Sequence, residues 1–121
     1  MDISELQRIY AGHPNTAGLA ALLEDSSVRT IFLGGLHASA TPLFISSFIR
    51  ENKQTFVFIL GDQEEAGYFY HDLTQVNGEE NILFFPSSYR RAIKYGQKDA
   101  ANEILRTEVL SRLQKVILCV L

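Results

Sequence analysis

Uninterrupted apolar stretches alternate with amphipathic stretches along the 121-residue chain. The uninterrupted stretches are rich in β-branched and aromatic residues and predict strands at about 29–34, 55–60, 81–85 and 116–121. Apolar residues at helical spacing predict helices at about 2–11, 16–23, 41–52, 63–76 and 98–113. Continuous apolar strands are typical of sheets that helices cover on both faces. The pattern therefore predicts an α/β fold, with a parallel sheet and flanking helices.

The loop between the first predicted strand and the next helix reads Gly35-Leu36-His37-Ala38-Ser39-Ala40-Thr41-Pro42. A phosphate-binding loop of the pattern G-x-x-x-x-G-K-[ST] is expected at this place, where the lysine reaches the phosphates and the hydroxyl binds Mg²⁺. Gly35 is retained. The three later positions are occupied instead by Ala40, Thr41 and Pro42. The sequence therefore predicts a degenerate loop that binds no ATP, with no catalytic residue, cofactor or metal.

Composition narrows the class of protein. A hydrophobic content of 46% with 21% charged residues is typical of a globular domain. No apolar run is long enough to span a bilayer, and the N-terminus lacks the pattern of a secretory signal. A single cysteine, Cys119, cannot form an internal disulfide, so we expect a cytoplasmic protein. His13 and His71 are too scattered in the sequence to suggest a metal site. His37 lies in the loop, and no serine or cysteine nucleophile with an orienting carboxylate is evident near it.

The net charge of −3 argues against bulk electrostatic binding of nucleic acid. Four cations nevertheless fall within a short stretch, interleaved with Tyr89 and Tyr95: Arg90, Arg91, Lys94 and Lys98. This stretch is a candidate for weak contact with nucleic acid or a partner. The alternative that we favour is a solvated loop whose cations lie at the surface.

The last predicted strand runs to the final residue. Domains seldom end on a core strand, so we expect one domain over 1–121 that is part of a longer protein, with 1–27 as a leading helical segment.

Three stretches carry a family resemblance: the segment 35–49 (GLHASATPLFISSFI), the run 82–86 (ILFFP), and Lys98-Asp99-Ala100 followed by Asn102-Glu103. They resemble the N-terminal part of the bacterial transcription-repair coupling factor and the related first domain of UvrB, the damage-verifying subunit of the excinuclease. UvrB retains Gly-Lys-Thr where this chain has Ala40, Thr41 and Pro42. It also carries a tyrosine-rich DNA-clamping hairpin where this chain has only 87–97. Both differences favour the coupling factor.

The resemblance implies a UvrB-like module, a fragment of a RecA-like P-loop NTPase fold, with a structural or interaction role. Its parent would displace RNA polymerase stalled at DNA lesions by ATP-driven translocation on double-stranded DNA, and recruit nucleotide excision repair through UvrA. ATP and Mg²⁺ would belong to the parent's C-terminal motor, and the fragment's own partners would be other domains of the same chain, in the bacterial cytoplasm and away from membranes. The alternative is the N-terminal part of a UvrB-like or helicase enzyme that still binds ATP.

Overall fold

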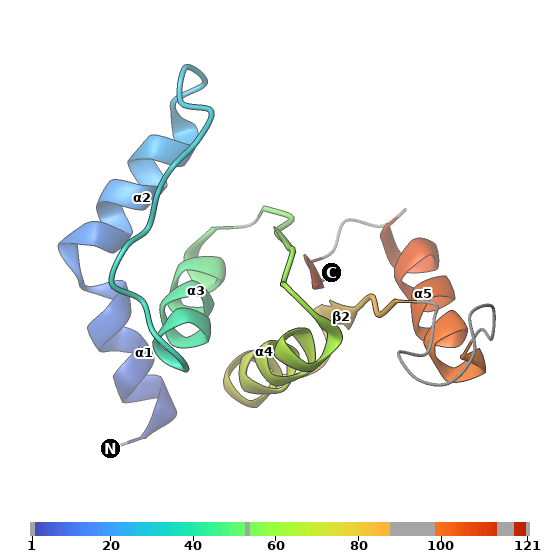
Figure 1. The fold of residues 1–121 in the computed structure, drawn as a ribbon. Helices are drawn as coiled ribbons and strands as arrows, with labels where there is room; N and C mark the ends of the chain where they lie inside the picture. Colours follow the sequence, from blue (N-terminus) through green and yellow to red (C-terminus); the bar gives the residue numbers. More distant parts are fainter. Residues whose placement is uncertain (1, 53, 88–98, 114–117, 121) are drawn as a thin grey trace. The chain divides into compact units, whose positions relative to one another are not determined.

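The computed structural model describes residues 2–52, 54–87, 99–113 and 118–120 (Figure 1). The chain divides into two compact units, Met1–Lys53 and Gln54–Leu121. Five helices account for most of the described residues: α1 (Ile3–Ala11), α2 (Pro14–Glu24), α3 (Ala40–Glu51), α4 (Gln63–Asn77) and α5 (Ala100–Leu113). Over these described parts, none of the helices has both the length and the apolar character that a membrane crossing requires.

The N-terminal unit is built from α1, α2 and α3. Helix α1 packs on α3, and α2 contacts both. A polar link joins α1 to α3: the buried Gln7 donates from Nε2 to the Ser46 hydroxyl at 3.4 Å and accepts from Arg50 at 3.0 Å. Because both ends of the Gln7 amide are bonded, its burial costs little.

Residues 25–39, between α2 and α3, contain neither helix nor strand. Figure 1 shows this connection running back along α2. The strand predicted at 29–34 is therefore wrong. A strand exists only when its backbone groups pair with another strand, and the other elements of this unit are helices. The β-branched and aromatic residues of this stretch lie in an irregular connection, where Phe32 is 92% exposed.

The C-terminal unit contains α4, α5 and three very short strands: β1 (Val57–Phe58), β2 (Ile82–Phe84) and β3 (Leu118–Val120). Strand β3 pairs in parallel with the other two, so the order is β1-β3-β2. Helix α4 begins where the Asp62 carboxylate accepts the N–H of Glu65 at 2.9 Å, and the Glu65 carboxylate accepts the N–H of Gly61 at 2.9 Å. It ends at Gly78, which has the left-handed φ of +80° that favours glycine.

Successive residues of β2, and Phe85 after it, contact α4 and α5 in turn. Phe84 lies against Tyr70 of α4, with ring centroids 5.4 Å apart. Leu83 is buried with Val109 of α5, and Phe85 packs against that pair. The guanidinium of Arg106 lies 4.0 Å from the centre of the Phe85 ring. This alternation follows from the two-residue period of an extended chain, and it gives the unit an apolar centre between α4 and α5.

The predicted fold class is wrong. We expected a parallel sheet with flanking helices, as in a RecA-like P-loop NTPase. The described chain is instead mostly helical, and its strand fragments are two or three residues long. The strand that should lead into the phosphate loop is missing. The helices, in contrast, form within two residues of the predicted ends, because capping and amphipathic spacing act locally.

Candidate functional site

The loop at the start of α3 is the site that the sequence singled out. Gly35 has φ +83°, a conformation that glycine adopts without strain. Ala38 has φ +48°, which is unfavourable for a residue with a Cβ atom. Ser39 precedes the helix in a helical conformation, and its side chain makes no capping hydrogen bond. The loop thus closes into a tight turn directly before the helix.

The turn engages the backbone N–H groups at the start of α3. The amide of Ala40 donates to the carbonyl of His37 at 3.0 Å, and that of Thr41 donates to Ala38 at 3.2 Å. Pro42 is buried and has no N–H, and the amide of Leu43 donates to Ser39 at 3.2 Å. None of the first four residues of α3 therefore offers an unbonded backbone N–H to an anion.

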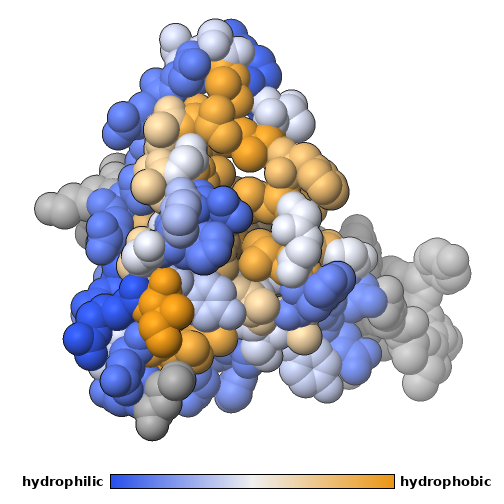
Figure 2. Space-filling view, turned by 90° about the vertical axis from the view of Figure 1, so that its left-hand side faces the viewer, coloured by the Kyte–Doolittle hydropathy of each residue, from blue (hydrophilic) through white to orange (hydrophobic). Residues whose placement is uncertain are grey.

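An apolar hollow of about 480 Å³ lies between α2 and the connection that follows it. A space-filling view from the side of α1 and α2 shows hydrophobic residues gathered around it (Figure 2). Its wall includes Leu19, Leu22, Ile31, Phe32, Leu36 and Phe44. Tyr10 and His13 are the titratable groups that line it, and no carboxylate, lysine or arginine does. The hollow therefore offers a phosphate neither a lysine nor an arginine.

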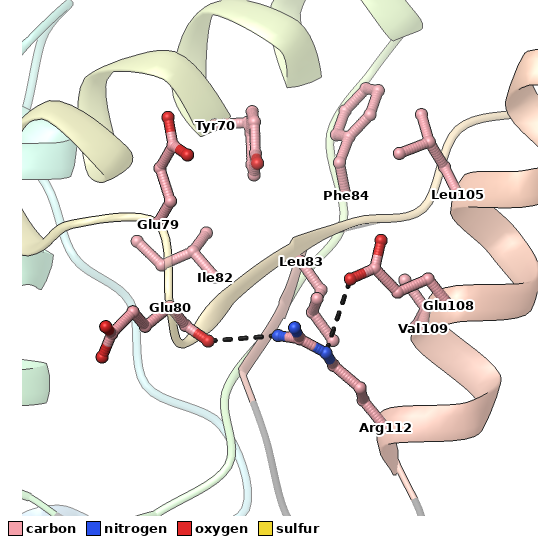
Figure 3. Close-up of a pocket in the computed structure, with 10 residues that line it drawn as sticks. All are labelled: Tyr70, Glu79, Glu80, Ile82, Leu83, Phe84, Leu105, Glu108, Val109 and Arg112. Atoms are coloured by element: carbon pink, nitrogen blue, oxygen red, sulfur yellow. Dashed lines mark hydrogen bonds and ion pairs between the residues drawn. The ribbon is translucent and has the colours of Figure 1, made fainter.

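A second hollow, of about 370 Å³, lies in the C-terminal unit among α4, β2 and α5 (Figure 3). Its floor is apolar, and its rim carries Glu79, Glu80, Glu108 and Arg112. Arg112 already interacts at two points: its Nε lies 3.4 Å from Glu108 Oε1, and its Nη1 donates to the Glu80 carbonyl at 3.2 Å.

The electrostatics of this second hollow disfavour anions. The lining carries three carboxylates and one guanidinium, which is already paired with Glu108. Burial raises the pKa of the Tyr70 phenol above its usual 10, and the negative charges of Glu79 and Glu108 raise it further. The lining includes no serine, cysteine or lysine, so it offers no nucleophile of the usual kinds.

The second hollow was not predicted from the sequence. Glu79 and Glu80 are both exposed, in the turn after α4. The available signal was the spacing of Glu108 and Arg112, four residues apart on a helix. That spacing predicts a surface ion pair, and it does not reveal the strand and the second helix that complete the hollow.

The other predicted candidates do not assemble into a site. The basic stretch Arg90, Arg91, Lys94 and Lys98 lies outside the described residues. His37 is exposed in the loop. The Nδ1 atom of His71 lies 3.7 Å from Oδ1 of its sequence neighbour Asp72. Among the described residues, no three histidine, cysteine or acidic side chains come together as a metal site would require.

Comparison of the chain with protein-family models, with curated proteins and with solved structures found no match. The family resemblance therefore depends on the three sequence stretches alone.

Proposed function

We propose that this chain is a non-catalytic structural and interaction module of a bacterial transcription-repair coupling factor. In this proposal the parent protein displaces stalled RNA polymerase from damaged DNA in the cytoplasm and recruits excision repair through UvrA. The ATP, the Mg²⁺ and the contacts with double-stranded DNA belong to other parts of the parent. The role of this chain is to support neighbouring domains.

The start of α3 is the observation that carries the proposal. Its amides are engaged in the turn, its lysine position is Thr41 and its hydroxyl position is Pro42. Even an unbonded helix N-terminus stabilises an exposed anion by only about 0.3–1 kcal/mol. Micromolar affinity for a nucleotide requires about 8 kcal/mol. The hollow in the C-terminal unit does not supply the difference, because its carboxylates repel phosphate.

The repair context is supported by the sequence resemblance alone, and the loop geometry supports the non-catalytic role. The alternative, a UvrB-like or helicase enzyme that binds ATP through this loop, requires the amides of Ala40 and Thr41 to leave their present partners. It also requires the charge that Thr41 lacks. Neither requirement has support in the described residues.

Calorimetric titration with Mg-ATP tests the proposal. The wild-type chain is expected to give no heat of binding at micromolar nucleotide. The matched variant is Thr41→Lys/Pro42→Thr, which restores the two missing side chains and one N–H. Circular dichroism of both proteins shows whether each is folded. A micromolar dissociation constant for the folded wild type would overturn the proposal and favour the nucleotide-binding enzyme.

A further inference from the structure

The helix α2 is capped at its start by a histidine. His13 has the extended backbone of an N-cap residue, with φ −72° and ψ 136°, and its Nδ1 accepts the backbone N–H of Asn15 at 3.2 Å. Caps are usually the oxygens of serine, threonine, aspartate or asparagine, which keep their lone pairs at neutral pH. An imidazole nitrogen accepts a hydrogen bond only while it carries no proton.

The other groups in the first turn of α2 have partners that do not titrate. Pro14 has no N–H, and the amide of Thr16 donates to the carbonyl of His13 at 2.9 Å. The Thr16 hydroxyl donates to the carbonyl of Tyr10 at 2.6 Å. The Asn15 amide is therefore the group in this turn whose partner disappears when the imidazole gains a proton.

Charged groups occur on each of the three helices of this unit. The first turn of α2 carries no acidic residue, and Glu24 lies at the opposite end of that helix. Helix α1 contributes Arg8 in its last turn and the phenol of Tyr10, and α3 carries Arg50 in its last turn. No ion pair to His13 occurs within the described residues. An imidazolium would also face the positive end of the helix dipole.

We propose that His13 is a proton-sensitive cap: protonation of its imidazole releases the Asn15 amide and loosens the first turn of α2. Because His13, Asn15 and Leu19 line the apolar hollow of the N-terminal unit, the change alters one wall of that hollow. Histidine side chains ordinarily change their charge between about pH 5 and 8, which sets the pH range of the test. The cap is independent of the proposed function.

We test this proposal by NMR measurement of amide hydrogen exchange on the 121-residue chain, from about pH 8 down to about pH 5. After correction for intrinsic exchange, protection of the Asn15 amide is expected to fall about fivefold, which corresponds to about 1 kcal/mol of lost capping. The matched variant His13→Asn keeps a capping oxygen and removes the titration, so its protection should not change with pH. His13→Asp serves the same purpose if the asparagine variant does not fold.

Two results would overturn the proposal. One is unchanged protection of the Asn15 amide in the wild type across this pH range. The other is an equal loss of protection in the wild type and in the variant with the capping oxygen, since the cause would then lie outside His13.

Discussion

Replacing Leu73 by alanine should strongly destabilise the C-terminal unit. Leu73 lies in α4, one turn after Tyr70, and its side chain is fully buried at 0% exposure. The change removes three buried side-chain carbons, each worth about 0.8 kcal/mol, or about 2.4 kcal/mol in total. The cavity that remains adds to this, so the cost lies between about 2.4 and 5 kcal/mol. That is a large part of a typical domain's stability of about 5–15 kcal/mol.

The matched control is the same substitution at Leu110 of α5, where the side chain is 60% exposed. The chemical change is identical, and alanine is a slightly better helix former than leucine. We expect the free energy of unfolding to change by no more than about 0.5 kcal/mol. The difference between the two variants therefore isolates the burial of Leu73 from any general effect of the leucine-to-alanine change.

Urea unfolding followed by helical circular dichroism measures both free energies. The midpoint for Leu73→Ala should fall well below that of the wild type, at an unchanged slope, and the midpoint for Leu110→Ala should stay close to it. A cost below about 1 kcal/mol at Leu73, or equal costs at the two positions, would refute the packing of α4 against the rest of its unit.

Two further predictions concern ionisation. In the C-terminal hollow, the pKa of Tyr70 is raised, so the phenol ionises at a lower pH in the unfolded chain than in the folded one. The contribution of Tyr70 to stability is therefore complete below pH 10 and is lost as the pH rises through the pKa of the folded state. Glu108→Gln should lower this pKa in an ultraviolet titration of the phenol, and an unchanged titration curve would contradict the placement of Glu108. After α2, hydrogen bonds from the Ser27 hydroxyl and from the Ser27 backbone N–H lower the pKa of the Asp25 carboxyl below 3.8. The stabilisation from Asp25 is therefore present above pH 3.8 and is lost as the pH falls through the pKa of the folded state. In a carboxyl NMR titration, Ser27→Ala should raise the pKa of Asp25, whereas Ser26→Ala should leave it unchanged.

The helices could be predicted because their signals are local. The cap at Asp62 and Glu65 and the stop at Gly78 are separated from the residues that they bond by no more than four positions, and α4 begins and ends where these residues predict. One detail differs from a capping box: Glu65 accepts the N–H of Gly61, one residue earlier than expected. Hydrogen bonds of this kind join residues close in sequence, so a local pattern is enough to indicate them.

The absence of a strand at 29–34 could not be predicted in the same way. The residues of this stretch have the side chains that strands favour, but such a preference measures how well a side chain fits a pleated, half-buried surface. That surface requires a neighbouring strand, and a neighbouring strand is a long-range property. The same limit applies to the C-terminal hollow, where Glu108 and Arg112 are close in sequence while Tyr70 and Phe84 come from distant elements.

The loop at α3 shows both kinds of signal at one place. The loss of the lysine and the hydroxyl is a fact of the sequence, since Thr41 and Pro42 occupy their positions. The engagement of the amides is a fact of the backbone, since it depends on the positive φ of Ala38 and the turn that follows. These are independent obstacles to a phosphate. Restoring the two side chains removes the sequence obstacle and leaves the engaged amides in place. The Thr41→Lys/Pro42→Thr variant should therefore gain affinity for Mg-ATP yet bind more weakly than micromolar. Micromolar binding by that variant would show that the turn opens at little cost in free energy.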